Sequence, residues 1–175
     1  ARLVDRLAAD EASVIAFDVF LPEPEAHDAL LADALDRAGN VILPVVFDFS
    51  GQIPHRQESP QLDATAIRDV GDSEYFQRVA PITAEGVLLP VPALAETAMG
   101  LGQINMFPDR DGVLRWESLL VAYQGRLIPS MSLLAAASHK GIAFESLHVE
   151  AGRSIGVGRT LIPTDPFGRM LINYR

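Results

Sequence analysis

Residues 14–47 read VIAFDVFLPEPEAHDALLADALDRAGNVILPVVF, and their pattern predicts the fold class. Its two ends, residues 14–20 and 41–47, are short apolar runs rich in branched and aromatic side chains, which is typical of buried strands. Between them, leucines and alanines recur at helical spacing from Asp28, the expected N-cap, to Gly39, just past the helix end. Strand, helix and strand in this order predict a parallel βαβ unit.

The later segments predict antiparallel hairpins. Residues 103–107 and 113–123 are expected strands around a turn that ends at Gly112, and Gln124-Gly125 makes a second turn. A helix capped by Ser130 follows, and short strands fill residues 147–174. We therefore predict one α/β domain over residues 1–175, a mixed β-sheet with flanking helices, in which an N-terminal βαβ unit is followed by antiparallel hairpins.

Three further expectations concern the first half of the chain. Pro44 removes one backbone donor from the second strand and so predicts an edge position or a bulge. Residues 49–71 are expected to be mostly loop, with one turn of helix at residues 64–69, and residues 72–79 could form another short helix.

Composition excludes several classes of function. The chain has no cysteine, which excludes disulfides, thiolate nucleophiles and thiolate zinc sites. The formal net charge is −9, and residues 1–75 hold 15 acidic and 5 basic residues, whereas residues 76–175 hold 8 and 9. Because an acidic surface repels phosphates, we expect neither a nucleic acid nor an anionic membrane as partner. No run approaches the roughly 20 apolar residues of a spanning helix, and nothing predicts a cofactor.

One segment matches a hydrolase pattern. Residues 152–156, GRSIG, fit G-x-S-x-G, in which a strand-to-helix turn exposes the serine. Here Gly158, a short apolar run and Pro163 follow in place of a helix, and no histidine comes after Ser154. We interpret the segment as a glycine-rich connection between strands.

Asp18 is the first candidate for a ligand site. Its place at the end of a predicted strand is that of the nucleophile in haloacid dehalogenase-type phosphatases. Those enzymes need a second carboxylate two residues later, where this chain has Phe20. Ligands of open α/β sheets bind at the carboxyl edge of the strands, so Asp18 would line a pocket beneath residues 22–27. Asn105 and Arg115 would supply an amide and a cation from the other side. The alternative is that Asp18 and Arg115 only pair with each other or cap loops.

Asp109 and Asp111 are the remaining candidates. They flank Arg110 before Gly112, which resembles part of a calcium loop, but the further acid or amide and the later Glu of such a loop are missing. We expect turn formers, with a ligand contact as the alternative. The histidines form no pair at ligand spacing, so no metal site is predicted; they are His27, His55, His139 and His148.

Four segments together resemble the type-two CHASE domain, a sensory module associated with cyclases and histidine kinases. They are VIAFDVFLPEPEAHDALLADAL (residues 14–35), GNVILP (39–44), GLGQINMFPDRDGVLRWESLL (100–120) and LIPTDPFGRMLINY (161–174). Their order and spacing match the family across most of the chain, and residues 102–115 with the last 14 residues are the more specific part.

The resemblance implies an extracytoplasmic sensor, either without a ligand or with a small-molecule ligand that is unknown. It implies membrane helices outside this chain, a cytoplasmic adenylyl cyclase, histidine kinase or Ser/Thr kinase, and a homodimer formed through the parent protein. Family members typically continue past Tyr174, so the chain is expected to be a fragment that lacks the family's C-terminal segment. The alternatives are a small soluble hydrolase, either phosphatase or esterase, and a module that serves only dimerisation.

Overall fold

The computed structural model describes residues 1–53, 59–71, 74, 79 and 81–174. At its centre is the predicted βαβ unit: β1 (Ile15–Ala16), α2 (Asp28–Ala38) and β2 (Val41–Asp48), with β1 and β2 parallel. On the other side of β2 lies β6 (Gly100–Gln103), which is also parallel to it. The parallel core of the sheet is thus β1-β2-β6, and the α/β prediction is confirmed.

Along the edge of β2 that pairs with β1, the last three residues of β2 pair with another strand. The Ile42 carbonyl accepts from the Phe17 amide, 3.0 Å away, and the Asp48 carbonyl accepts from the Glu85 amide, 2.8 Å away. Both acceptors are even-numbered residues, whose backbone groups point to the same side of a strand. The antiparallel strand β5 (Gly86–Leu88) therefore continues the edge that β1 begins.

This arrangement explains why Pro44 is tolerated in a central strand. Pro44 pairs with Gly102 of β6, so the expectation of an edge position was wrong. The Pro44 nitrogen points to the side of β2 on which β1 and β5 pair. The pairing with β1 ends at Ile42 and the pairing with β5 begins at Val46, so Pro44 lies between the two. No described strand offers a carbonyl there, and the missing donor therefore breaks no ladder hydrogen bond.

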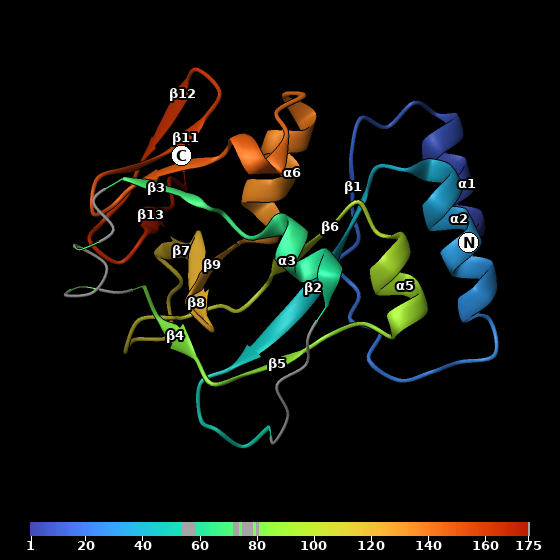
Figure 1. Ribbon diagram of the computed structural model, residues 1–175, viewed down its shortest axis with the longest axis horizontal. Coiled ribbons are helices and arrows are strands. Elements are labelled where there is room, and N and C mark those ends of the chain that lie inside the picture. Colours follow the sequence, from blue (N-terminus) through green and yellow to red (C-terminus); the bar gives the residue numbers. More distant parts are fainter. Residues whose placement is uncertain (54–58, 72–73, 75–78, 80, 175) are drawn as a thin grey trace.

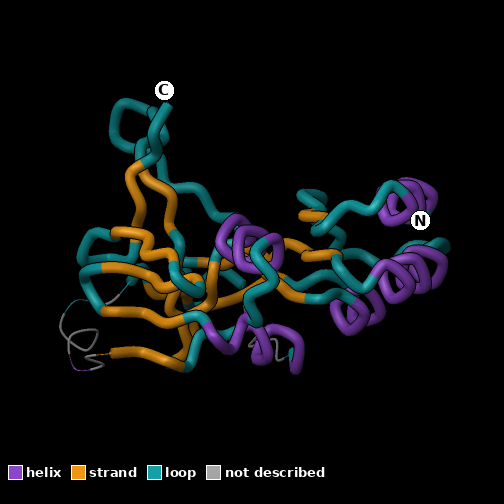
Figure 2. The backbone as a smooth tube through the Cα atoms, turned by 90° about the horizontal axis from the view of Figure 1, so that it is seen from above, coloured by secondary structure: helices purple, strands orange, loops and turns teal. Residues whose placement is uncertain are grey.

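Helices cover both faces of this sheet (Figures 1 and 2). Odd-numbered Leu43 and Val45 belong to a buried cluster with side chains of α2 and of α5 (Pro92–Thr97). The helix α1 (Arg2–Ala9) packs against α2 and adds to the same cluster. Even-numbered Ile42 belongs to a second buried cluster with Leu133 and Leu134 of α6 (Met131–His139). Burial on both faces is why β2 reads as a continuous apolar run.

The rest of the chain forms smaller sheets beside this core (Figure 1). One has the order β12-β11-β10-β3 and a second the order β4-β8-β9, while β7 pairs with β13. Two short helical segments, α3 and η1, are also present among the described residues. Their bounds are α3 (Pro60–Thr65), β3 (Asp69–Gly71), β4 (Thr83–Ala84), β7 (Trp116–Ser118), β8 (Leu120–Tyr123), β9 (Arg126–Pro129), η1 (Phe144–Ser146), β10 (His148–Glu150), β11 (Ser154–Val157), β12 (Thr160–Pro163) and β13 (Arg169–Leu171).

Local signals gave correct elements in several places. Gly39 ends α2 in the left-handed conformation, with φ of 65°, and the Ser130 hydroxyl accepts from the Leu133 amide at the start of α6. Gln124 and Gly125 form the turn of the β8–β9 hairpin. The predicted hairpins over β10, β11 and β12 are antiparallel, as expected.

Other expectations were wrong. The first strand is Ile15–Ala16 alone, not residues 14–20, and Asp28 is the first residue of α2 rather than its N-cap, which is His27. The helix expected at residues 64–69 is α3, which Ser59 and Pro60 start earlier. Most of the short helix expected at residues 72–79 lies outside the described residues.

The largest error concerns the first predicted hairpin. Residues 103–107 and 113–123 do not pair with each other: Gln103 ends β6, residues 104–115 are a loop, and β7 pairs with β13. The turn itself is present, since Gly112 has φ of 79° and its amide donates to the Asp109 carbonyl over 2.8 Å. Partners from distant parts of the chain displace the local pairing that the turn suggested.

Candidate functional site

Asp18 lies in the segment between β1 and α2, with an exposed side chain, and the Val19 amide donates to the Phe17 carbonyl across it over 2.8 Å. Because β1 ends at Ala16, Asp18 lies just past the strand end, as the carboxyl-edge hypothesis requires. Three residues later the segment is fixed to the β5–α5 connection, since the Leu21 carbonyl accepts from the Val91 amide over 3.0 Å.

Asn105 extends the β6 side of the sheet by means of its side chain. Its Oδ1 accepts from the Phe47 amide over 2.8 Å, and its Nδ2 donates to the Phe47 carbonyl over 2.9 Å. The amide thus copies the pairing of a strand residue after β6 has ended. Its position in the fold is set by this pairing with β2.

Gln103 is a buried polar residue that the sequence argument did not single out. Its side chain is 2% exposed and joins two segments: Nε2 donates to the Ser118 carbonyl, and Oε1 accepts from the Asn105 amide over 2.8 Å. A buried polar group must find partners, so a glutamine at the start of an expected strand was the available signal. It ties the loop after β6 to β7.

Asp109, Asp111 and Arg115 form one ion cluster in the 104–115 loop. The Arg115 guanidinium contacts Asp111 through two nitrogens, at 2.9 and 2.7 Å, and Asp109 at 2.8 Å. The hydrogen bonds from Arg115, with a smaller one from the Val113 amide, lower the pKa of Asp111 to about 2. The two carboxylates raise the pKa of Arg115 in turn. The predicted turn-forming role of the two aspartates agrees with this geometry.

The five candidate residues are therefore not brought into one site by direct contacts. The structure joins three of them in the ion cluster, places Asn105 against β2 on the β6 side, and leaves Asp18 exposed beyond β1, on the other side of β2. Arg115 pairs with Asp109 and Asp111, whereas its pairing with Asp18 is not seen among the described residues. The ligand roles of the five side chains stay a prediction.

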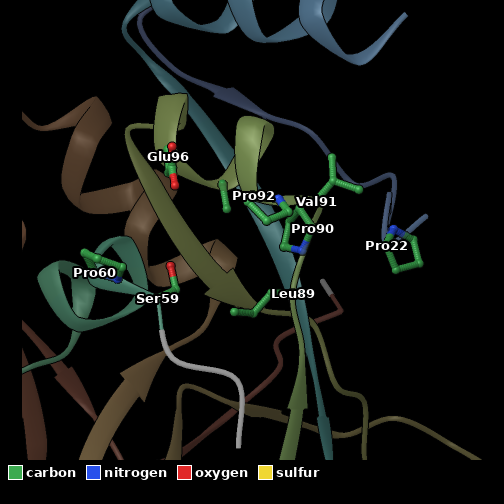
Figure 3. A pocket seen from close by; sticks show the side chains of 9 residues that line it. Pro22, Ser59, Pro60, Leu89, Pro90, Val91, Pro92 and Glu96 are labelled. Atoms are coloured by element: carbon green, nitrogen blue, oxygen red, sulfur yellow. The ribbon is translucent and has the colours of Figure 1, made fainter. Parts of the chain in front are cut away.

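A cavity of about 330 Å³ does lie near the end of the β1 segment (Figure 3). Pro22 comes from that segment, Leu89 to Pro92 from the β5–α5 connection, Ala95 and Glu96 from α5, and Ser59 and Pro60 from the start of α3. The wall is mostly proline and aliphatic carbon. Among the described lining residues, Glu96 supplies a carboxylate, and Ser59 supplies a hydroxyl that accepts from the Leu62 amide over 3.4 Å. This lining suits a small, mainly apolar group.

Asp48, at the carboxyl end of β2, holds the following turn instead of facing a ligand. Its carboxylate accepts from the Ser50 hydroxyl over 2.6 Å and from the Ser50 and Ile53 amides over 2.9 and 2.8 Å. These hydrogen bonds, the Ser50 hydroxyl first, lower the pKa of Asp48 to about 2. Asp48 is therefore an anionic turn former.

The other polar motifs have structural positions too. Ser154 is the first residue of β11, paired with Pro163 and Glu150, so the strand-connection interpretation of GRSIG is confirmed. His148 of β10 has its Nδ1 2.9 Å from Asp69 Oδ2 and its Nε2 3.5 Å from Glu150 Oε2. His139 contacts the Ser13 hydroxyl at 2.9 Å, whereas His55 lies outside the described residues. Within the described ranges, no group of three or more acidic or histidine side chains is placed to hold a metal ion.

Among the helices that the structure describes, none is long and apolar enough to span a bilayer. Comparison with curated proteins and with solved structures gives no significant match to this chain. Comparison with family models gives one: the CHASE2 domain model matches residues 1–175, which is the whole chain. CHASE2 domains are non-catalytic sensory domains of signalling proteins, generally on the outer side of the membrane. The protein chain therefore belongs to the CHASE2 domain family.

Proposed function

We propose that this chain is the extracytoplasmic signal-input domain of a membrane-bound bacterial adenylyl cyclase, histidine kinase or Ser/Thr kinase. In this role it passes a ligand-binding or dimer-state signal across the membrane to the cytoplasmic enzyme. The observation that carries the proposal is the family match over all 175 residues. The mixed sheet, with cavities between its connections, gives further support, because a sensor needs a surface that a small molecule can fill.

The proposal includes a homodimer formed through the parent protein. A dimer gives the signal a route, since a change in how two domains pair moves the segments that enter the membrane. A small hydrolase has less support, because Ser154 opens a strand rather than standing on a strand-to-helix turn. A module that only dimerises would respond to no small molecule.

The first experiment tests which side of the membrane the domain occupies. The chain has no cysteine, so Lys140→Cys places a single thiol at an exposed position next to α6. In the full-length signalling protein, with other cysteines replaced, this thiol should react with a membrane-impermeant maleimide in cells whose inner membrane is intact. Labelling only after that membrane is lysed would overturn the extracytoplasmic assignment.

Ala137→Cys is the matched control, because Ala137 lies on the same helix and is fully buried. Its thiol should stay unlabelled in the same cells and react only when the domain is unfolded. The pair of variants thus reports location and folding separately, so that a misfolded protein is not mistaken for a translocated one.

A further inference from the structure

A cavity of about 660 Å³ lies between the end of α3, β3 and the β8–β9 turn. One hydrogen bond joins two of its walls: the Ile67 amide donates to the Leu127 carbonyl over 2.9 Å and fixes the chain after α3 beside β9. The tight turn then places the first residue of β9 opposite α3, since Gln124 and Gly125 both have positive φ, 50° and 76°. Its lining residues are Asp63, Ala66, Ile67, Arg68, Val70, Gly125, Arg126 and Leu127.

Two arginines and one carboxylate line this cavity. Arg126 forms an ion pair with Asp63 of α3, and both side chains are partly exposed. Arg68 is exposed and has no ion-pair partner among the residues that the structure describes. The next residue, Asp69, turns the other way along β3 and lies 2.9 Å from His148 Nδ1. Among the described residues, the lining thus holds one positive charge more than its carboxylate balances, in a chain whose net charge is −9.

Apolar atoms line the cavity beside the charges. The nonpolar residues of the lining are Ala66, Ile67, Val70 and Leu127. A guanidinium group binds a carboxylate through two parallel hydrogen bonds, and such charge-assisted pairs are stronger than neutral ones. The lining therefore matches a small molecule that carries a carboxylate on a short aliphatic body.

We propose that this cavity, which we call the arginine cavity, binds a small organic carboxylate. Arg68 holds the carboxylate, Arg126 contributes the hydrogen-bond donors that Asp63 leaves free, and the nonpolar part of the lining contacts the carbon chain. Binding at this site does not depend on the proposed signalling function. Only its meaning as the sensed signal rests on that function.

The test is calorimetric titration of the chain with succinate, inorganic phosphate and the neutral succinamide at fixed ionic strength. Succinate should bind and succinamide should not. Arg68→Gln should weaken succinate binding by about tenfold or more, because it removes one charge-assisted pair. Arg159→Gln is the matched control: it removes another exposed arginine, from the β11–β12 turn, that has no ion pair within the described part of the chain, and it should leave the affinity unchanged.

Asp63→Asn provides the sharper variant. It removes the carboxylate that competes for Arg126, so succinate should bind several-fold more tightly than to the wild type, a gain that a purely structural role of Asp63 does not give. Equal affinity of wild type and Arg68→Gln, or no binding at millimolar succinate, overturns the site. Binding of phosphate in place of succinate overturns the carboxylate assignment. Since no membrane or output enzyme takes part, these failures are distinct from a failure of the signalling proposal.

Discussion

Gly102 lies where β6 passes close to the first residue of α6. A Cβ atom added at Gly102 would lie 2.5 Å from the Met131 Cα and 2.7 Å from its backbone nitrogen. Backbone atoms at the start of a helix have little room to move, in contrast to the tip of a flexible side chain. At this position glycine therefore serves close approach between sheet and helix, and nothing in a single sequence distinguishes this from a turn glycine.

Gly102→Ala should destabilise the fold by about 1–3 kcal/mol, the usual cost of forcing an extra methyl group into a packed interior. Gly156→Ala is the matched control, because Gly156 also lies in a strand and its added Cβ would meet neighbours only at 3.7 Å or more. Urea unfolding followed by circular dichroism would measure both variants. Equal stability of Gly102→Ala and wild type would contradict the close approach of β6 and α6.

Among the structural elements, the 104–115 loop is held in part by ion pairs between its own side chains. Backbone hydrogen bonds tie its two ends to neighbouring strands, from the Ile104 amide to the Val45 carbonyl and from the Ile172 amide to the Arg115 carbonyl. Between these ends, the Arg115 guanidinium makes three contacts to Asp109 and Asp111. Exposed ion pairs of this kind contribute little each, and a shared bidentate geometry is what gives them weight. The loop should therefore depend on the ionisation of Asp111.

Acid should weaken this loop. The pKa of Asp111 is lowered in the folded state to about 2, below the roughly 3.9 of an unfolded chain, so the carboxylate stabilises the fold above pH 4. That contribution is lost as the pH falls from about 4 to 2. Asp111→Asn should lower the melting temperature at pH 6 and make it less dependent on pH between 4 and 2. An unchanged pH profile, measured by thermal unfolding, would show that the cluster contributes nothing.

The elements that could be predicted from the sequence are those with local causes. Ser130, Gly39 and the Gln124-Gly125 turn each act within a few residues, and each gave a correct boundary. The first hairpin failed because β6 and β7 take partners far along the chain, β2 and β13. Pairing over such distances depends on which surfaces are buried together, and that information is spread over the whole sequence.

The candidate site was less predictable than the fold. Asp109, Asp111 and Arg115 were chosen for their chemistry and do meet, because they lie within seven residues of each other. The arginine cavity was missed because Asp63, Arg68 and Arg126 come from three segments joined by the Ile67–Leu127 bridge. The spacing of these residues along the chain does not predict that they lie close together in the fold.

At the scale of the molecule, β2 connects two buried clusters that lie on its opposite faces. Leu43 and Val45 belong to the cluster with α2 and α5, and Ile42 belongs to the cluster with α6, β10 and β11. A strand that serves both cores couples them, because neither face can lose its contacts without disturbing the strand. This coupling supports the expectation that residues 1–175 form a single domain.

That expectation can be tested with the single tryptophan of the chain. Trp116 lies on β7, with the Arg169 guanidinium 5.0 Å from its ring centre, and so reports on the β7–β13 pair. Leu43→Ala empties space in the other part of the molecule and should cost about 2–5 kcal/mol. In one cooperative domain, the unfolding transitions followed by tryptophan fluorescence and by circular dichroism should shift to lower denaturant together and by the same amount.

Leu161→Ala, at a side chain that is 69% exposed, is the control and should move neither transition. A tryptophan transition that stays in place while the circular dichroism signal shifts would show that the layer of α1, α2 and α5 unfolds alone, as a second domain.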